Sequence, residues 1–320
     1  MRPLRLGTRG SQLALWQART VAHLVEQHGT AVEIVTIKTS GDRLQDAALT
    51  DAGGKRLFVK EIEDALLDRT IDLAVHSAKD MPAVLPDGLS VAAVLPREDP
   101  RDALLLPGGR TAEHVGAAQA MLGQNPSIGT SSVRRIAQLA MMLPHARFAP
   151  IRGNVDTRLR KLDEGGYHAL VLAVAGLKRL GFDARVSLAI PVADCIPAPG
   201  QGIVAIEIRA DDAETREAVA AVNDASASQS LDAERALVNT LGGGCQLPLG
   251  AIALHVDEDL EMHAVVASVD GTRIVKRSDR GPASQPTALG RRLADELVRG
   301  GALEILDQVR SAQGPIEGSH

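Results

Sequence analysis

Strand-like and helix-like hydrophobic patterns alternate along the first two thirds of the chain. LRLGTR (4–9) is strand-like, and SQLALWQARTVAHLVEQHG (11–29) after it has the spacing of an amphipathic helix. The same succession returns at SIGTSSVRRIAQLAMML (127–143) and at HALVLAVAGLKRLGF (168–182). Repeated strand–helix units of this kind favour domains built on open α/β sheets.

Two proline-rich stretches divide these units into two groups. VAAVLPREDPRDALLL (91–106) contains two prolines between strand-like segments, and CIPAPGQGIVAIEIR (195–209) leads through prolines and glycines into another strand. We therefore expect two α/β domains, with a chain that leaves the first domain and later returns to it.

The C-terminal part has a different pattern. LDAERALVNTL (231–241) is helix-like, three alternating segments follow with acidic or Asp-Gly turns between them, and 286–309 is again helix-like. We expect a smaller α+β domain here, followed by a disordered tail. The expected bounds are 1–102 with 200–220 for domain 1, 103–199 for domain 2, 221–312 for domain 3 and 313–320 for the tail.

Composition argues against several classes of protein. A chain of 320 residues, 45% of them apolar, can bury the cores of two or three domains. Two distant cysteines make neither a disulfide framework nor a zinc site, which predicts a cytoplasmic location. The N-terminus lacks the apolar core of a signal peptide, and the longest apolar run, 169–177, is about half of the ~20 residues that span a membrane. The net charge of −5 argues against nucleic acid as a partner.

Polar side chains gather where the predicted strands of both α/β domains end. Ligands bind at the carboxyl ends of strands in such sheets, where helix N-termini and arginines favour anions. Between Thr130 and Lys161, seven Lys or Arg residues stand against one acidic residue, Asp156. Neither GxGxxG nor a P-loop is present, so the pattern predicts a ligand rich in carboxylates rather than a nucleotide. The four clusters are Thr8, Arg9 and Ser11; His76, Ser77, Lys79 and Asp80; Thr130, Ser131, Ser132, Arg134 and Arg135; and Arg152, Gly153, Asn154 and Arg158.

Single members of these clusters also have plain structural explanations. Ser132 precedes a helix as an N-cap residue would, and any one arginine could form a surface ion pair. Arg134 and Arg135 are adjacent on a helix, so we expect them to point in different directions. His76, at the end of an apolar strand, is interpreted as structural. Asp80 either caps a turn or serves in acid–base chemistry or in hydrogen bonding to the N–H of a bound ring.

The two cysteines lie in different surroundings. Cys245 belongs to GGGCQLPLG (242–250), behind a helix expected to end at Leu241 and without Lys, Arg or His within several residues. The local sequence therefore argues against an activated, turnover-type thiolate. Two interpretations stay open: a small buried residue in a tight turn, or a residue whose glycines let something bulky approach the backbone. Cys195 follows an apolar stretch and is interpreted as structural.

Ten stretches of the chain resemble the porphobilinogen deaminase (hydroxymethylbilane synthase) family. They cover nearly the whole chain in the family's order: TRGSQLALWQ, GGKRLFVKEIE, IDLAVHSAKDMP, REDPRDAL, IGTSSVRR, RGNVDTRLRKLD, LAVAGLKRL, PGQG, AERA and GGGCQLPLG. The resemblance implies two α/β domains like type II periplasmic binding proteins plus a smaller α+β C-terminal domain. It implies a monomeric transferase of porphyrin and heme biosynthesis, which condenses four porphobilinogen molecules, with loss of ammonia, onto a dipyrromethane cofactor. Hydrolysis would then release 1-hydroxymethylbilane.

The resemblance also implies a role for each cluster. Each pyrrole ring carries an acetate and a propionate, so a growing chain of rings needs many cationic donors. Cys245 would hold the dipyrromethane through a thioether, and Asp80 would contact pyrrole nitrogens and stabilise positive charge as ammonia departs. The other implied cofactor-binding residues are Lys79, Thr130, Ser131, Ser132, Arg134, Arg135 and Gly153. The implied substrate-binding residues are Arg9, Ser11, Arg152, Arg158, Arg179 and Gln201. Lys55, Arg56 and Phe58 would lie in a loop over the cleft, and no metal is implied.

Two positions depart from the family pattern. Arg56 stands where the family usually has glycine in GGKGLF, which should stiffen the loop and could add a carboxylate contact. Gly242 stands where EGGC is commoner, which removes an acidic residue near the cofactor.

Two other functions stay open from the residues themselves. A binding protein for a polyanionic or amino-acid ligand, without catalysis, would share the two-domain architecture, but the missing signal peptide and the third domain with its cysteine argue against it. A cysteine-dependent hydrolase or transferase is disfavoured because no His–Cys pairing is suggested by the sequence.

Overall fold

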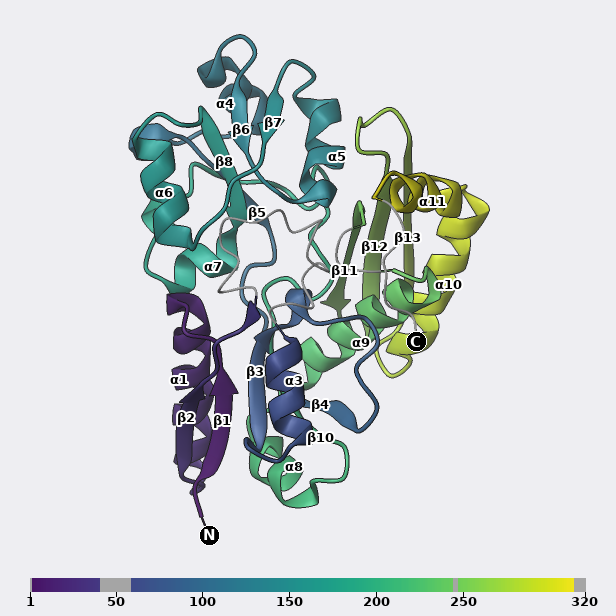
Figure 1. The fold of residues 1–320 in the computed structure, drawn as a ribbon. Coiled ribbons are helices and arrows are strands. Elements are labelled where there is room, and N and C mark those ends of the chain that lie inside the picture. Colours follow the sequence, from purple (N-terminus) through teal and green to yellow (C-terminus); the bar gives the residue numbers. More distant parts are fainter. Residues whose placement is uncertain (1, 41–58, 244–246, 314–320) are drawn as a thin grey trace.

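The computed structural model describes residues 2–40, 59–243 and 247–313. These residues form two five-stranded sheets and one three-stranded sheet, and the third lies beside the other two (Figure 1). The expected fold class, two α/β domains with a smaller C-terminal domain, is confirmed. The residue bounds given above for the three domains stay predictions.

The first sheet has the strand order β2-β1-β3-β10-β4. Its strands are β1 (Leu4–Thr8), β2 (Val32–Thr36), β3 (Leu73–Ser77), β4 (Leu89–Val94) and β10 (Val204–Arg209). β1 is parallel to β2 and β3, whereas β10 runs antiparallel to β3 and β4. The helices of this part are α1 (Gln12–Gln27), α3 (Lys60–Leu67) and α8 (Ala213–Ala220). β10 belongs to the first sheet but follows all strands of the second sheet in sequence, so the chain returns to the first domain.

The second sheet repeats this plan with the order β7-β6-β8-β5-β9. Its strands are β5 (Asp102–Leu105), β6 (Ser127–Gly129), β7 (Arg147–Ala149), β8 (Ala169–Ala173) and β9 (Leu188–Ala189). The parallel strands β6, β7 and β8 are followed by helices, and β5 is the antiparallel insertion between β8 and β9. The helices are α4 (Val115–Leu122), α5 (Val133–Met142), α6 (Val155–Asp163) and α7 (Val174–Arg179).

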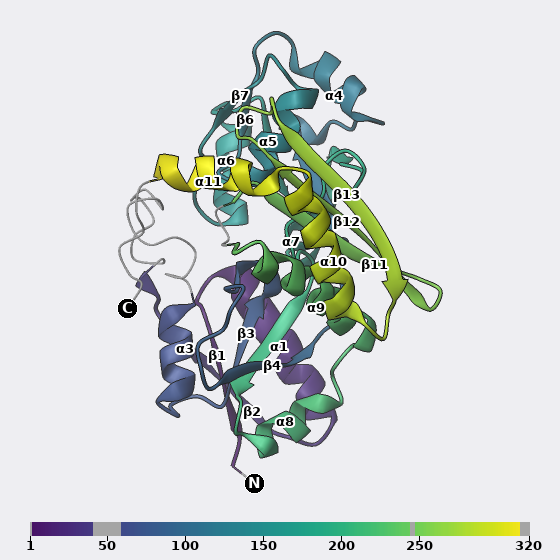
Figure 2. The ribbon, with the colours of Figure 1, turned by 90° about the vertical axis from the view of Figure 1, so that its right-hand side faces the viewer.

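The third sheet is an antiparallel meander, as the alternating segments predicted. Its elements are β11 (Leu249–Val256), β12 (Asp259–Ala267), β13 (Ile274–Pro282), α9 (Ala225–Thr240), α10 (Pro286–Arg299) and α11 (Ala302–Gln313). Figure 2 shows α9 and α10 side by side next to these strands. Leu237, Leu293 and Ala264 belong to the apolar core that the helices share with the sheet.

A buried carboxylate joins the third sheet to both crossing segments. Glu234 of α9 pairs with Arg97, its two oxygens lying 2.6 and 3.1 Å from the guanidinium nitrogens. The same carboxylate accepts hydrogen bonds from the backbone N–H of Gly200 and of Ala253. A fully buried charge is tolerated here because it is paired and its oxygens are satisfied. This contact fixes the crossings at which the candidate site is built.

Some elements differ from the expectations. The helices α4 and α8 and the short strand β9 were not predicted, and α9 begins at Ala225 rather than at Leu231. The helix α11 reaches Gln313, one residue into the expected tail, and 314–320 lie outside the described residues. The loop that the resemblance implies for Lys55, Arg56 and Phe58 also lies outside them.

Candidate functional site

The predicted polar clusters lie where strands pass into helices. Ser11 is the N-cap of α1, and its Oγ accepts a hydrogen bond from the Ala14 N–H at 3.3 Å. Ser132 caps α5 in the same way, with the Arg135 N–H as donor at 3.5 Å. Arg9 follows β1 directly. Ser132 therefore has the capping role considered for it, and Ser11 has the same role, both at helix N-termini that favour anions.

Loops of the second domain bring two further clusters together. Ser131 Oγ donates to the Ile151 carbonyl at 2.9 Å and lies 3.1 Å from its N–H, which fixes the loop after β6 against the loop after β7. Gly153 has a φ of +105°, and a Cβ there would lie 2.8 Å from Thr157 Cγ2. Glycine is required at this position by both criteria. Its carbonyl accepts from Arg158 Nε at 2.7 Å.

Lys79 and Asp80 occupy a short 3₁₀ turn, η3 (Ala78–Asp80), directly after β3. Lys79 Nζ lies 3.4 Å from the side-chain oxygen of Gln201, which comes from the second crossing segment. Burial lowers the pKa of the Arg158 guanidinium on α6, and Asp80 is close enough for its negative charge to offset part of that lowering. The first domain therefore places its candidate acid–base residue opposite a cation of the second domain.

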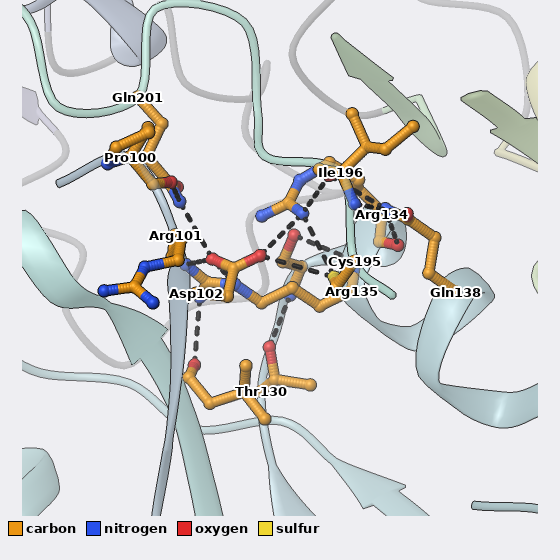
Figure 3. Close-up of polar contacts among 12 residues, drawn as sticks. Pro100, Arg101, Asp102, Thr130, Arg134, Arg135, Gln138, Cys195, Ile196 and Gln201 are labelled. Carbon is orange, nitrogen blue, oxygen red and sulfur yellow. Dashed lines mark hydrogen bonds and ion pairs between the residues drawn. The ribbon is translucent and has the colours of Figure 1, made fainter. Parts of the chain in front are cut away.

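Arg134 and Arg135 do not point in different directions, contrary to the expectation. Both reach the buried Asp102 at the start of β5, from one side and the other of its carboxylate (Figure 3). Long side chains on neighbouring helical positions can converge on one acceptor, which backbone direction alone does not reveal. Burial by itself would raise the pKa of the Asp102 carboxyl, but the two guanidinium charges hold it well below its usual range.

Arg158 and Arg179 are in a different electrostatic position. Burial, together with the Arg135 charge, lowers the pKa of Arg158 to about 10, and burial also lowers the pKa of Arg179. Arg158 donates to a backbone carbonyl, and Arg179 donates to the Gly202 carbonyl at 2.7 Å. Among the described residues, neither guanidinium lies within ion-pair distance of a carboxylate. An anionic ligand would supply the missing counter-charge.

Two residues that were interpreted as structural are deeply buried. His76 Nε2 lies 3.0 Å from Glu207 Oε2, and both side chains are shielded from solvent. Cys195 is a free, fully buried thiol that donates to Asp102 Oδ2 at 3.4 Å. Burial raises the pKa of the Cys195 thiol to about 12, so it is neutral at pH 7. The interpretation of Cys195 is consistent with these contacts.

Several predicted residues cannot be placed. Lys55, Arg56, Phe58 and Cys245 lie outside the described residues. Gly242, which departs from the family pattern, is described: it follows α9 with a φ of +61°, and its carbonyl accepts from Arg310 Nη2 at 2.8 Å. A side chain at Gly242 would therefore be strained whatever the space around it.

No group of three or more His, Cys, Asp or Glu side chains among the described residues could hold a metal ion. No helix within the same residues has the length and apolar character needed to cross a membrane.

These observations define an α/β protein of two similar domains with a third domain joined to their crossings. Cations from both domains and one candidate acid–base carboxylate gather at the strand ends. Porphobilinogen deaminase is the family that the sequence matches. The model of its dipyromethane cofactor binding domain matches residues 4–217, and the model of its C-terminal domain matches residues 229–299. The chain belongs to the porphobilinogen deaminase family, and it is a transferase of tetrapyrrole biosynthesis with a dipyrromethane cofactor.

Full-length relatives carry the same name. The porphobilinogen deaminase of Syntrophobacter fumaroxidans is 45% identical over 313 residues, 97% of this chain and 99% of that protein. That of Desulforudis audaxviator is 49% identical over 312 residues, with the same two coverages. A solved structure of an ancestral cationic amino acid solute binding protein is similar with a TM-score of 0.42 and 15% identity, over 68% of this chain and 86% of that one. The family, with its transferase activity, replaces the alternative of a binding protein without catalysis.

Proposed function

We propose that this chain binds porphobilinogen at the strand ends of its two α/β domains and joins four molecules, one after another, to a dipyrromethane held by Cys245. The observation that carries the assignment of residues is the unbalanced charge of Arg158 and Arg179, which are partly buried and have no carboxylate in ion-pair contact among the described residues. Porphobilinogen carries two carboxylates, and each supplies the counter-charge that one such arginine lacks.

The residues present fit the cofactor. Arg134 Nε is buried without a hydrogen-bond partner in the described part of the chain. Arg134 and Arg135 share Asp102, which Gln201 connects to Lys79. A carboxylate-bearing ligand would satisfy such a donor. When bound, the dipyrromethane supplies the pyrrole carbon to which the first substrate is joined. Arg134, Arg135, Lys79 and the loops of Thr130, Ser131, Ser132 and Gly153 would hold its carboxylates.

Asp80 is proposed as the catalytic residue. Its carboxylate would accept a hydrogen bond from the substrate's ring N–H and stabilise the positive charge that develops as the bond to ammonia breaks. It would later take up the proton that the ring loses. Arg9, Ser11, Arg152, Arg158, Arg179 and Gln201 would bind the incoming substrate, and Lys55, Arg56 and Phe58 would belong to the active-site loop that the resemblance implies. The free thiol of Cys195 supports a reducing, cytoplasmic location, and the family resemblance implies a monomer.

Intact mass spectrometry of the purified chain tests this assignment. Protein made in a host with a normal porphyrin supply should carry an adduct of two pyrrole units. We expect Cys245→Ser to lose the adduct and Cys195→Ala, the matched control, to keep it. An unmodified wild-type mass, or an adduct that persists in Cys245→Ser, would contradict the proposal.

A further inference from the structure

Asp102 lies at the centre of the candidate site, although the sequence did not single it out. It opens β5, it is fully buried, and its carboxylate accepts hydrogen bonds from Arg134, Arg135, Gln201 and Cys195. We propose that Asp102 is a positioning residue, the internal counter-ion that aligns Arg134 and Arg135 for the carboxylates of the ligand. This inference rests on the proposed role of the two arginines in holding the cofactor.

The two oxygens of the carboxylate are divided between the arginines. Asp102 Oδ2 accepts from Arg134 Nη1 at 2.7 Å, and Oδ1 accepts from Arg135 Nε at 2.9 Å and lies 2.8 Å from its Nη2. Each guanidinium is held from a second side as well, because Arg134 Nη1 donates to the Ile196 carbonyl at 2.7 Å and Arg135 Nη1 to the Val171 carbonyl at 2.9 Å. Bound from two sides, both side chains have a fixed orientation in the absence of ligand.

The charge of this cluster is not balanced. Arg134 and Arg135 are 4% and 8% exposed and Asp102 is 0% exposed, so two buried positive charges share one negative charge. Gln201 is neutral, and so is Cys195 at pH 7 because of its raised pKa. One positive charge is therefore left over for a ligand carboxylate, and Arg134 Nε is a buried donor with no partner among the described residues.

The cluster also reaches the first domain. Gln201 is 1% exposed, and its Nε2 donates to Asp102 Oδ1 at 3.0 Å and to the Pro100 carbonyl at 2.7 Å. Its Oε1 lies 3.4 Å from Lys79 Nζ. Asp102 thus connects the arginines of α5 with Lys79 through a residue of the crossing segment. The side-chain amide of Gln201 thus lies between the Asp102 carboxylate and the Lys79 ammonium group.

The counter-ion role is tested with the full chain made without cofactor, in a host that supplies no porphobilinogen. Asp102→Asn keeps the shape of the side chain and removes its charge. We expect its melting temperature to fall by roughly 6–10 °C, because the arginines lose the one buried carboxylate that pairs with them among the described residues. Added succinate, at an ionic strength held constant with sodium chloride, should raise the melting temperature of Asp102→Asn at least twice as much as that of the wild type.

Asp99→Asn is the matched control. Asp99 belongs to the same crossing segment and pairs with Arg101, whose side chain is 43% exposed. It should change the melting temperature by no more than about 2 °C and leave the succinate response at the wild-type value. If Asp102 were needed only for packing, Asp102→Asn would have a lower melting temperature but the same response to succinate as the wild type. That outcome would overturn the proposal. A wild-type melting temperature would overturn it too.

A double variant covers the case in which Asp102→Asn does not fold. Asp102→Asn with Arg135→Gln removes one charge of each sign and returns the cluster to a single positive charge. It should fold, and an unfolded double variant would count against the counter-ion role. The proposed function is judged separately: an Arg134→Leu chain that acquires its full two-pyrrole adduct would refute the role of the arginine in cofactor binding, and it would leave the succinate result unaffected.

Discussion

The guanidinium carbon of Arg179 lies 5.6 Å from the centroid of the Trp16 ring, so a cation of α7 rests on an aromatic face of α1. This contact crosses from one α/β domain to the other. Arg179 also donates to the Gly202 carbonyl, in the segment that returns the chain to the first sheet. The two contacts hold a guanidinium that burial makes less basic, at a position where the proposed substrate binds.

Replacing Trp16 should weaken substrate binding through Arg179. A cation–π contact of this kind contributes about 1 kcal/mol, so we expect Trp16→Leu to raise the KM for porphobilinogen about fivefold with a smaller effect on kcat. Trp16→Phe keeps an aromatic face and should stay within about twofold of the wild type. Steady-state kinetics of the three proteins decide the matter. Equal KM values for Trp16→Leu and the wild type would show that the contact has no part in binding.

Arg158 and Arg160 provide a matched pair on α6. Arg158 has no carboxylate in ion-pair contact among the described residues, whereas Arg160 is 63% exposed and pairs with Glu164 one turn away. A charge-assisted hydrogen bond is worth roughly 1.5–3 kcal/mol, so Arg158→Leu should lower kcat/KM by about 10- to 150-fold. Arg160→Leu should change it by less than about twofold.

The stability of Arg158→Leu should rise although its activity falls. Burial lowers the pKa of Arg158 to about 10 because its charge is poorly compensated. Arg158→Leu should therefore raise the melting temperature of the cofactor-free chain by a few degrees, and thermal unfolding measures this directly. A lower melting temperature in Arg158→Leu would show that the native contacts of Arg158 outweigh the burial of its charge.

Asp80→Asn should separate cofactor loading from turnover. The amide keeps the size of the side chain but does not take up a proton, so we expect a normal two-pyrrole adduct and a fall of kcat by about 100-fold or more. Asp87→Asn, seven residues further on and exposed, should leave both unchanged. Intact mass and initial rates are the two measurements. An Asp80→Asn enzyme with more than about a tenth of wild-type kcat would remove Asp80 from the chemistry.

The two cysteines should differ in reactivity. In denaturant, we expect two titratable thiols in the cofactor-free chain and one in the loaded chain, because Cys245 would be alkylated. In the native protein at pH 8, Cys195 should not react with iodoacetamide, since it is buried and its pKa is raised to about 12. Rapid native labelling of Cys195 would contradict this.

The raised pKa of Cys195 also predicts a loss of stability in alkali. The unfolded thiol has the lower pKa, about 8.5, so above that pH the unfolded chain binds fewer protons than the folded one, and stability falls as pH rises towards 12. The loss should be smaller in Cys195→Ala, compared with the wild type by thermal unfolding at pH 8 and pH 10.5.

Local pattern accounts for much of the fold. The β-hairpins of the third sheet follow from alternating side chains with acidic or Asp-Gly turns between them, and α5 and α6 from apolar spacing behind polar caps. The missed helices lack these signals. α4 (VGAAQAML) is almost uniformly apolar, and α8 (AETREAVA) opens with a polar, acidic stretch that is typical of a solvated segment.

The candidate site could be predicted only in part. The clusters at strand ends follow from the α/β pattern, because parallel strands end at the same edge of a sheet. Asp102 carried no such signal: its partners Arg134 and Cys195 lie 32 and 93 residues away, and only the folded sheet brings them together. The adjacency of Arg134 and Arg135 was misleading for the same reason, since a distant acceptor decides where both side chains turn.

The position of β10 has a consequence for biosynthesis. This strand pairs with both β3 and β4, yet it is translated after every strand of the second sheet. During synthesis, β3 and β4 lack the strand that lies between them until residue 209 has left the ribosome. The N-terminal domain therefore cannot be the first to complete its fold. The second domain, whose strands are continuous in sequence, can form its sheet first. Its folding brings the two crossing segments together, so that β10 can then pair with β3 and β4 and complete the first sheet.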